Sequence, residues 1–507
     1  MSIDVPITAP LAWLQAHLAI LPVLAPLVVA PLCALFRSGR IAGPLAVAAL
    51  WASLASSIAL LVQTSTTGAI SYTLGGWPAP YGIEYRIDQA SALVLLTISA
   101  VASVITPYSL KSAPNEIDRA RLGLYYTALL LCMAGLLGMV ATGDLFNLFV
   151  FLEISSLSTY ALISLGPDRR ALNAAFQYLI MGTIGATFIL IGVGFLYMQT
   201  GTLNMVDFAA RLPEVADTRS VRAGFAFLTV GVALKLALFP VHLWLPNAYT
   251  FAPAVVSALL AATATKAAAY VLVRLVFTVF GVEFALITMP LDAILMVLGI
   301  AALLTGSVIA IFQYELKRLF AYSSIAQIGY LAIGVSYGSA TGVAATLVHV
   351  FNHALMKGAL FLAIGLMVYR LGRSDFHGLR GLGRRMPVTA AALVLGGLSL
   401  VGVPPTVGFI SKWYLLLGAI EAEYWIAAGM VVFGSLLALI YVWRIIEAAY
   451  FQTPTGTSAH HREVPWLLLV PTWVLVLANL WFGLHTDFTV GVAEQAGRVL
   501  MGEAGTP

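Results

Sequence analysis

Four lysines of this chain lie inside hydrophobic segments long enough to cross a membrane. These residues are Lys235, Lys266, Lys357 and Lys412. A lysine near the centre of a bilayer costs about 2.5–3.5 kcal/mol on insertion scales, so it persists where it meets a partner, a water-filled cavity or a proton path. Lysine, unlike arginine, can change its charge state when burial and a moving carboxylate compete for its proton. The four are therefore candidate proton carriers, whereas Lys111 and Lys317 are expected in loops.

Glu153 is the acidic residue that lies deepest in a predicted span, within the segment GDLFNLFVFLE at 143–153. It is the natural counter-charge for an intramembrane lysine. The alternative is a static ion pair that only joins two helices, although buried pairs are poor stabilisers. Asp144, at the end of the same span, is favoured as an exposed or capping residue over an auxiliary proton-transfer residue.

A second group of titratable residues repeats every four positions in LVHVFNHALMKGALFL, which places His349, His353 and Lys357 along one predicted helix. Each step of four residues rotates by about 40°, so the three side chains share one face over about 12 Å. A single membrane histidine is usually a hydrogen-bonded packing residue. Three titratable groups in register favour a proton relay.

Two clusters of prolines interrupt these hydrophobic segments. Pro240 and Pro246 follow Lys235, and Pro404 and Pro405 precede Lys412. Proline removes a backbone donor and clashes with the preceding turn, so the first helix is expected to break near 239–247 and the second near 401–408. His242, inside the first break, either extends the path from Lys235 or satisfies freed carbonyl groups, and both readings stay open.

The elements that must position these residues are membrane helices. The chain is 61% hydrophobic and only 9% charged, with a mean hydropathy of +0.95, so we predict an all-α polytopic membrane protein. Hydrophobic stretches of membrane-spanning length predict fourteen spans, near 14–36, 41–62, 88–107, 120–141, 144–165, 171–199, 221–250, 253–280, 288–312, 317–336, 340–370, 387–418, 425–451 and 464–484.

The breaks fall in helices 7 and 12, which are corresponding positions of two five-helix repeats, helices 4–8 and 9–13. Each repeat has an odd number of spans, so the second repeat enters the membrane from the opposite face. The two repeats are therefore inverted. The predicted units are 1–118, 119–280, 288–451 and 452–507. Most Lys and Arg residues outside the spans fall in the loops that follow odd-numbered spans, which predicts that both termini lie on the outer face.

Several classes of function are excluded by what the sequence lacks. It has no phosphate-binding loop, nucleophile elbow or cysteine ligand set, so we expect no enzyme activity, no cofactor, no metal site, no ATP hydrolysis and no electron transfer in this chain. The net charge of +4 is small and follows the predicted topology, so no nucleic-acid partner is expected.

These segments together resemble the antiporter-like family shared by Mrp-type multisubunit cation/proton antiporters and the proton-pumping membrane subunits of respiratory complex I. The resemblance covers about 85–450, through GDLFNLFVFLE, ALKLALFPVHLWLPNAY, APAVVSALLAATATK, LVHVFNHALMKGALF and VPPTVGFISKW in the family's order and spacing. Within the family the chain is most similar to the D-type subunits of Mrp antiporters.

The resemblance implies fourteen helices with inverted repeats, and a role for each matching residue. Glu153 and Lys235 correspond to the modulating pair, Lys266 to a central carrier, and Lys412 to the terminal carrier. His349, His353 and Lys357 correspond to the connecting relay. It also implies a bacterial plasma membrane, other Mrp subunits as partners, and Na⁺ efflux in exchange for H⁺ along a hydrated axis. The sodium path lies in or beside this subunit.

Two other functions compete with the antiporter reading. A proton-pumping subunit of a redox-driven complex, similar to complex I or a membrane hydrogenase, would use the same residues. A membrane scaffold would use the buried charges only to assemble helices.

Overall fold

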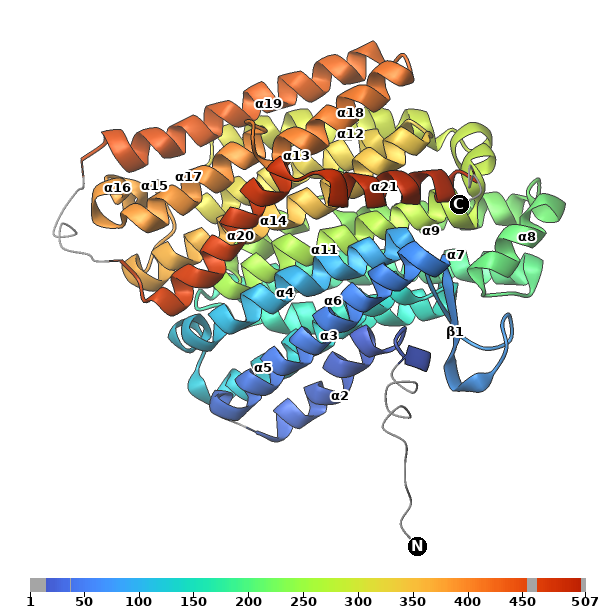
Figure 1. Cartoon of the computed structure of the whole chain (residues 1–507), viewed down its shortest axis with the longest axis horizontal. Helices are drawn as coiled ribbons and strands as arrows, with labels where there is room; N and C mark the ends of the chain where they lie inside the picture. Colours follow the sequence, from blue (N-terminus) through green and yellow to red (C-terminus); the bar gives the residue numbers. More distant parts are fainter. Residues whose placement is uncertain (1–14, 37, 454–462, 503–507) are drawn as a thin grey trace, which may run out of the picture.

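The computed structural model describes residues 15–36, 38–453 and 463–502 as a bundle of long helices that run roughly side by side (Figure 1). Within these residues, eleven helices are long and apolar enough to cross a membrane. The shorter helix α2 and the two interrupted pairs α9–α10 and α17–α18 lie where the other three spans are predicted. The all-α polytopic fold is therefore confirmed.

The first half of the chain contains α2 (Leu21–Leu35), α3 (Gly39–Thr67), β1 (Ile70–Thr73), β2 (Glu84–Ile87), α4 (Gln89–Glu116), α5 (Leu122–Ala141), α6 (Leu145–Ser164), α7 (Arg170–Thr200), α8 (Met205–Val215), α9 (Arg219–Leu236), α10 (Trp244–Phe251) and α11 (Ala254–Arg274). The second half contains α12 (Leu291–Ile311), α13 (Leu316–Ser336), α14 (Ala340–Leu371), α15 (Phe376–Leu379), α16 (Leu382–Arg385), α17 (Pro387–Val401), α18 (Val407–Glu421), α19 (Trp425–Ile446), α20 (Trp466–Leu484) and α21 (Asp487–Leu500).

The first break separates α9 from α10 and occupies residues 237–243. Ala237 takes up a left-handed conformation with φ of 60°, which ends α9 directly after Lys235 and Leu236. Pro240 lies in this break as predicted. The prediction for Pro246 is wrong, because this residue lies in the first turn of α10, where no intrahelical donor is needed. The Trp244 indole donates a 3.0 Å hydrogen bond to the freed carbonyl of Leu234.

The second break separates α17 from α18 and contains both Pro404 and Pro405, as predicted. Gly402 has φ of 89°, which a side chain would strain, and a Cβ there would lie 3.0 Å from the Lys412 side chain. A Cβ on Gly408 would lie only 1.7 Å from the Ser399 carbonyl oxygen. These glycines therefore let the start of α18 pack against the end of α17, which places Lys412 beside the break.

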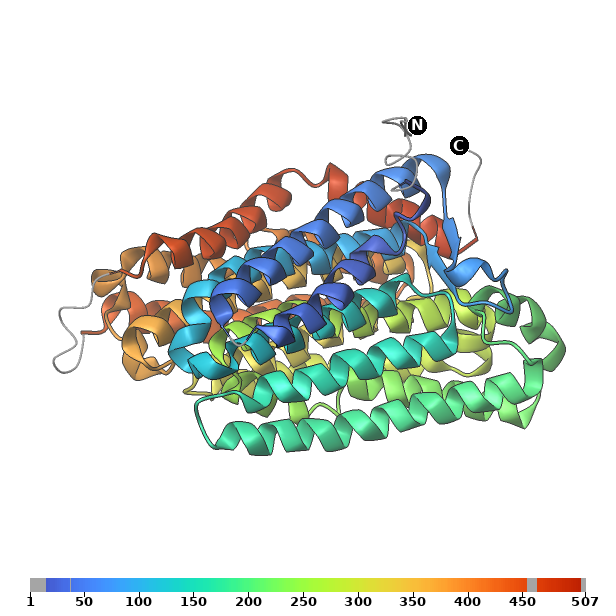
Figure 2. The same ribbon diagram turned by 90° about the horizontal axis from the view of Figure 1, so that it is seen from below.

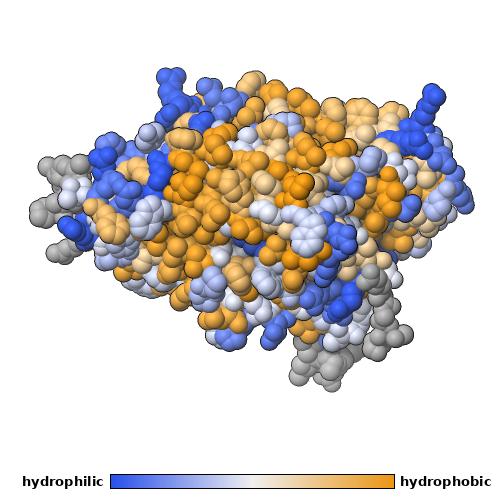
Figure 3. Space-filling view, turned by 90° about the horizontal axis from the view of Figure 1, so that it is seen from above, coloured by the Kyte–Doolittle hydropathy of each residue, from blue (hydrophilic) through white to orange (hydrophobic). Residues whose placement is uncertain are grey.

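Four of the titratable residues, Lys266, His349, His353 and Lys357, lie on the deeply buried helices α11 and α14. Every residue of α13 except Arg318 and Tyr322 is buried, and α14 is buried without interruption from Gly342 to Met367. Around this core, α2, α3 and α7 form the edges of the bundle (Figures 1 and 2). One face shows hydrophobic residues across its middle and hydrophilic residues toward its two ends, as expected for a protein surrounded by lipid (Figure 3).

The two ends of the bundle carry different short elements. The hairpin β1–β2, whose strands pair antiparallel with Ile70 opposite Ile87, lies at the same end as α8 and α21 (Figure 1). The opposite end carries α15 and α16. The hairpin is an addition to the predicted all-α fold, and α2 begins at Leu21 rather than near residue 14, which is outside the described residues. The termini also fall outside them, so their orientation stays a prediction.

Candidate proton-transfer site

Glu153 and Lys235 face each other between α6 and the end of α9. The carboxylate Oε1 lies 3.8 Å from the lysine Nζ, and Nζ donates a 2.7 Å hydrogen bond to Ser156 Oγ on α6. Within the described residues, Oε1 of Glu153 accepts no hydrogen bond. Lys235 also lies at the carboxyl end of α9, where a helix favours positive charge. The two residues predicted as partners are thus brought together, in a contact that is longer than a direct hydrogen bond.

Lys266 lies in the middle of α11 and is fully buried. Its Nζ donates a 2.5 Å hydrogen bond to the Ala261 carbonyl and lies 3.4 Å from Thr265 Oγ1. None of the ion pairs among the described residues includes Lys266. Its electrostatic neighbours are other titratable groups, His353 and Lys357 among them.

The three regularly spaced residues lie on the continuous helix α14, as their spacing predicted. The rings of His349 and His353 are nearly parallel, with 5.7 Å between their centroids. His349 Nδ1 lies 3.0 Å from Ser411 Oγ, while its Nε2 and both ring nitrogens of His353 have no hydrogen-bond partner within the described residues. Lys357 Nζ donates a 2.8 Å hydrogen bond to the Phe320 carbonyl.

Lys412 reaches back from α18 to the open end of α17. Its Nζ donates to the carbonyl oxygens of Leu400 at 3.0 Å and Val401 at 2.7 Å. The same nitrogen lies 5.3 Å from the centre of the Tyr330 ring, which in turn lies 5.7 Å from the His349 ring. The lysine is therefore held by backbone dipoles and an aromatic face and has no carboxylate partner within the described residues.

The two auxiliary candidates differ. Asp144 is buried and caps α6, because its carboxylate accepts a 2.7 Å hydrogen bond from the Asn147 backbone. The capping reading is confirmed and the exposed reading is wrong. His242 lies in the first break, where its buried ring stacks on Phe239 with 5.4 Å between centroids. No hydrogen bond joins it to Lys235 within the described residues, so its role stays a prediction.

The structure corrects the placement of Lys317, which the sequence puts in a loop. Lys317 is the second residue of α13, is buried, and donates a 2.8 Å hydrogen bond to the Ala252 carbonyl at the end of α10. It lines a cavity of about 410 Å³ together with Glu116, whose carboxylate accepts hydrogen bonds of 3.1 and 3.0 Å from the Ala254 backbone. The Lys317–Arg318 pair beside a short loop is typical of an exposed basic turn, so the sequence carried no signal for this burial.

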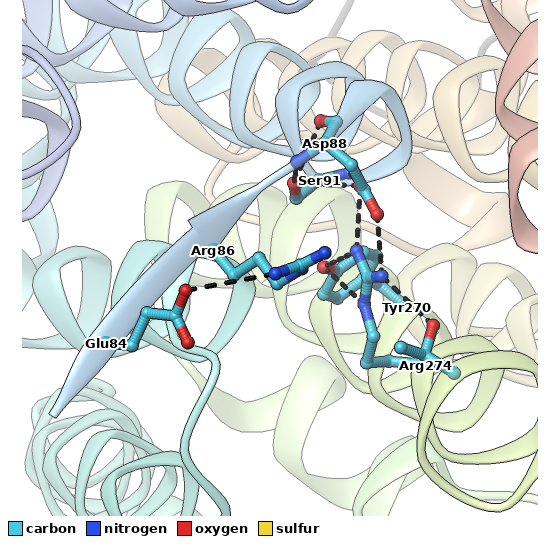
Figure 4. Close-up of polar contacts among 7 residues, drawn as sticks. Glu84, Arg86, Asp88, Ser91, Tyr270 and Arg274 are labelled. Carbon is cyan, nitrogen blue, oxygen red and sulfur yellow. Dashed lines mark hydrogen bonds and ion pairs between the residues drawn. The ribbon is translucent and has the colours of Figure 1, made fainter. Parts of the chain in front are cut away.

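A second buried ion pair, between Asp88 and Arg274, was also not predicted. Arg274 lies in the last turn of α11, and its guanidinium donates hydrogen bonds of 2.7 and 2.8 Å to the two Asp88 oxygens (Figure 4). Tyr270 accepts from the same guanidinium at 2.6 Å. Asp88 also caps α4 by accepting from the Ser91 backbone at 2.9 Å. The hairpin strand β2, with Glu84 and Arg86, leads directly into this cluster.

The surroundings of Asp88 keep it ionised. Burial raises the pKa of its carboxyl, but the positive charge of Arg274 and the hydrogen bonds from Arg274 and Ser91 outweigh burial and lower this pKa to about 2. Because arginine holds its proton, neither partner titrates near neutral pH. This pair is therefore a fixed clamp between the start of α4 and the end of α11.

Within the part of the chain that the structure describes, no group of three His, Cys, Asp or Glu side chains is arranged to hold a metal ion. The two cysteines, Cys33 and Cys132, are buried and unpaired.

The chain is similar to known membrane proteins over most of its length. The family described as NADH:quinone oxidoreductase/Mrp antiporter, TM, matches residues 142–438. The chain is 41% identical to the N-type subunit of the NADH-quinone oxidoreductase of Desulforudis audaxviator, over 94% of this chain and 97% of that protein. It is 31% identical to the D-type subunit of the Na(+)/H(+) antiporter of Bacillus subtilis, over 87% of this chain and 88% of that protein.

A chain of the Mrp complex from Dietzia sp. DQ12-45-1b superimposes with a TM-score of 0.88 at 25% identity, over 97% of this chain and 98% of that chain. The matched segment contains Glu153, Lys235, Lys266, His349 and Lys412, together with both helix breaks. The chain therefore belongs to the family of NADH:quinone oxidoreductase/Mrp antiporter transmembrane proteins.

Proposed function

We propose that this chain is the proton-translocating subunit of a multisubunit monovalent cation/proton antiporter. Protons move along a buried axis that starts at Glu153 and Lys235, continues through Lys266 and the α14 residues, and ends at Lys412. The observation that carries the proposal is the Glu153–Lys235 pair, because a 3.8 Å contact leaves both groups free to gain or lose a proton. Exchange with a cation gradient supplies the driving force.

The unpartnered polar atoms support a hydrated connection between the two halves. His349 Nε2, both ring nitrogens of His353 and the side-chain oxygens of Asn352 and Gln327 are buried without hydrogen-bond partners within the described residues. Such atoms are rare in a protein interior unless water or a transient proton partner satisfies them. We propose that a short chain of water molecules joins these atoms and transfers protons between Lys266 and Lys412.

The cavity beside Lys317 supports access from the predicted inner face to Lys266. Beyond it, Ser257 Oγ donates to the Tyr249 carbonyl at 2.7 Å, and the Tyr249 hydroxyl donates to the Leu260 carbonyl at 3.2 Å. Leu260 adjoins Ala261, whose carbonyl accepts from Lys266. Polar groups thus follow one another from the cavity to the buried lysine, along the junction of α10 and α11.

The exposure of Glu153 supports assembly with other subunits. A quarter of its side chain is exposed on α6, beside the exposed Leu157, although it lies in the middle of a span. Contact of a carboxylate with lipid is costly. We propose that a neighbouring subunit covers this face of α6 in the assembled complex, consistent with the multisubunit complex formed by the Dietzia relative.

The proposal is tested by exchange in inverted membrane vesicles that contain the complete complex. Addition of Na⁺ to respiring vesicles should dequench a pH-sensitive dye with the native chain, and Lys412→Ala should abolish this signal while the complex stays assembled. Arg121→Ala removes one positive charge at an exposed position on the same predicted side and is the control. Normal dequenching with Lys412→Ala contradicts the proposal, and loss of assembly in this variant favours the scaffold function.

A second candidate function is supported by the 41% identity to a membrane subunit of an NADH-quinone oxidoreductase. In that case the same residues would pump protons that a redox reaction in other subunits drives. The purified complex separates the two. Quinone-dependent proton uptake by proteoliposomes, without a cation gradient, would establish the redox-driven pump, and Na⁺-driven proton exchange without a quinone or reductant would establish the antiporter.

A further inference from the structure

A cavity lies between the ends of α3, α4 and α5 at the predicted inner side of the membrane, away from the proton-transfer residues. Its volume is about 640 Å³, which is enough for a lipid headgroup but larger than a single phosphate needs. Helix α3 lies on the outer side of the bundle, beside α2 (Figure 1), and its exposed hydrophobic residues Ile41, Trp51 and Val62 indicate that it faces the lipid.

The charges around this cavity are unbalanced. Arg40, Lys111 and Arg119 line it, and among the residues that the structure describes no carboxylate does. None of these three cations forms an ion pair within the described residues. The two nearest acidic side chains in sequence are engaged elsewhere, because Glu116 accepts from the Ala254 backbone and Asp118 accepts from the Ala120 backbone. The cavity therefore favours an anion.

Neutral polar groups at the same place suit a phosphate. The Ser38 hydroxyl and the Asn115 amide both line the cavity. Ser38 also caps α3, a helix of 29 residues, so the positive end of the α3 dipole points into the cavity. Together with the three cations, these groups offer the donors that phosphate oxygens require.

The other residues around the cavity are apolar, which suits the acyl chain of a lipid and offers nothing to a soluble phosphate. Pro44, Leu122 and Tyr126 form the cavity wall toward the membrane interior. Leu110, which also lines it, is 40% exposed, and Ile41, which follows the lining residue Arg40 on α3, is 48% exposed. An acyl chain could lie on this surface while the headgroup occupies the basic end.

We propose that this cavity binds the phosphate of an anionic glycerophospholipid, with Arg40, Lys111 and Arg119 as the phosphate ligands. Basic pockets between membrane helices on the inner side are typical sites for anionic lipids. The lipid joins the first helices to the antiporter core, because α3 carries one ligand and the other two lie near the α4–α5 connection.

Native mass spectrometry of the complete complex tests this site. The complex is titrated with phosphatidylglycerol, with phosphatidylcholine and with inorganic phosphate. The test variant is Arg40→Gln/Lys111→Gln/Arg119→Gln. The control variant, Arg121→Gln/Arg169→Gln/Arg384→Gln, removes the same charge from residues on the same predicted side that do not line the cavity.

We expect one phosphatidylglycerol molecule to bind the native and control complexes, and to bind the test variant about fivefold more weakly for each removed charge. Phosphatidylcholine should bind weakly to all three. Equal phosphatidylglycerol binding by the test and control variants would overturn the site, as would a neighbouring subunit that excludes lipid from it. Displacement of the lipid by inorganic phosphate at equal concentration would show that the cavity takes free phosphate instead.

Discussion

Within the described residues, two carboxylates pair with a buried cation, and the pairs differ in how completely each partner is hydrogen-bonded. Asp88 and Arg274 share two hydrogen bonds of 2.7 and 2.8 Å. Glu153 and Lys235 are 3.8 Å apart, and one carboxylate oxygen of Glu153 has no hydrogen-bond partner within the described residues. A bidentate pair with arginine is rigid and keeps its charges, whereas a looser pair with lysine can exchange a proton.

The pairs also differ in what lies beyond them. Apart from Asp88, the Arg274 guanidinium bonds within the described residues only to Tyr270 and Thr278, one turn before and one turn after it. Lys235 lies directly before a helix break, where the freed carbonyl of Leu234 accepts a hydrogen bond from Trp244. On the proposed function, this chain uses an arginine in a structural clamp and a lysine in a proton switch, and one carboxylate oxygen of the switch has no hydrogen-bond partner within the described residues.

The largest expected effect is that of Glu153→Ala. Removing the switch should lower cation-driven proton exchange about a hundredfold, the lower end of the contribution of a positioned proton-transfer group. The amount of assembled complex should stay unchanged, because Lys235 keeps its hydrogen bond to Ser156 and, unlike an arginine, can lose its proton once the carboxylate is gone. Dye dequenching in inverted vesicles measures the exchange, and Glu283→Ala removes the same charge at an exposed position. Exchange within a factor of about two of the native rate would exclude Glu153 from the path.

Asp88→Asn should lower the stability of the complex and leave proton exchange unchanged, the opposite of Glu153→Ala. It leaves Arg274 buried without a counter-charge, which costs about 3–5 kcal/mol of stability. We therefore expect a lower melting temperature and less assembled complex, but native exchange for each complex that does assemble. Thermal melting of the purified complex and exchange normalised to complex content provide the two measurements. A stable complex that has lost proton exchange would show that the Asp88–Arg274 pair takes part in proton transfer and is not only a structural clamp.

The pH dependence of the Asp88 contribution follows from its lowered pKa. The carboxyl pKa is depressed to about 2 in the folded state, so its contribution is fully present above the unfolded pKa near 4 and is lost as the pH falls through 2. The difference in melting temperature between the native chain and Asp88→Asn should therefore stay constant from about pH 6 to 8. A difference that changes over this range would show that Asp88 titrates in the folded protein.

Lys235→Arg replaces the carboxylate–lysine pair by a carboxylate–arginine pair, the type of pair that Asp88 and Arg274 form. Arginine keeps the positive charge but holds its proton, so exchange should fall about tenfold or more while assembly is retained. Lys111→Arg, the same change at an exposed lysine, serves as the control. If Lys235→Arg exchanged protons at the native rate, the lysine would act only through its charge.

The smallest expected effect is that of Ser156→Ala, which removes the hydroxyl that holds Lys235. A single hydrogen bond to a charged group contributes about 1.5–3 kcal/mol, part of which a water molecule can replace. Exchange should fall severalfold in vesicle assays without loss of assembly. Ser158→Ala, on the same helix and bonded to its own backbone, should leave exchange unchanged.

Residues that are energetically unfavourable inside a membrane span could be predicted from the sequence. The lysines in hydrophobic segments, the four-residue spacing on α14 and the prolines before Lys412 all leave local signals. The Asp88–Arg274 pair leaves none, because its partners are 186 residues apart and each lies near the end of a span, where charges are common. Pro246 was misplaced because a proline suits the first turn of a helix as well as a break. Tertiary packing alone decides whether Asp88 and Arg274 pair and whether Pro246 lies in the break or in the helix.

The most direct test is infrared difference spectroscopy of the assembled complex during an imposed pH change, with the native chain, Glu153→Gln and Asp88→Asn. We predict a carboxyl protonation band in the native complex that disappears in Glu153→Gln and persists in Asp88→Asn. A band that persists in Glu153→Gln, or one that disappears only in Asp88→Asn, would contradict the assignment of Glu153 as the proton switch.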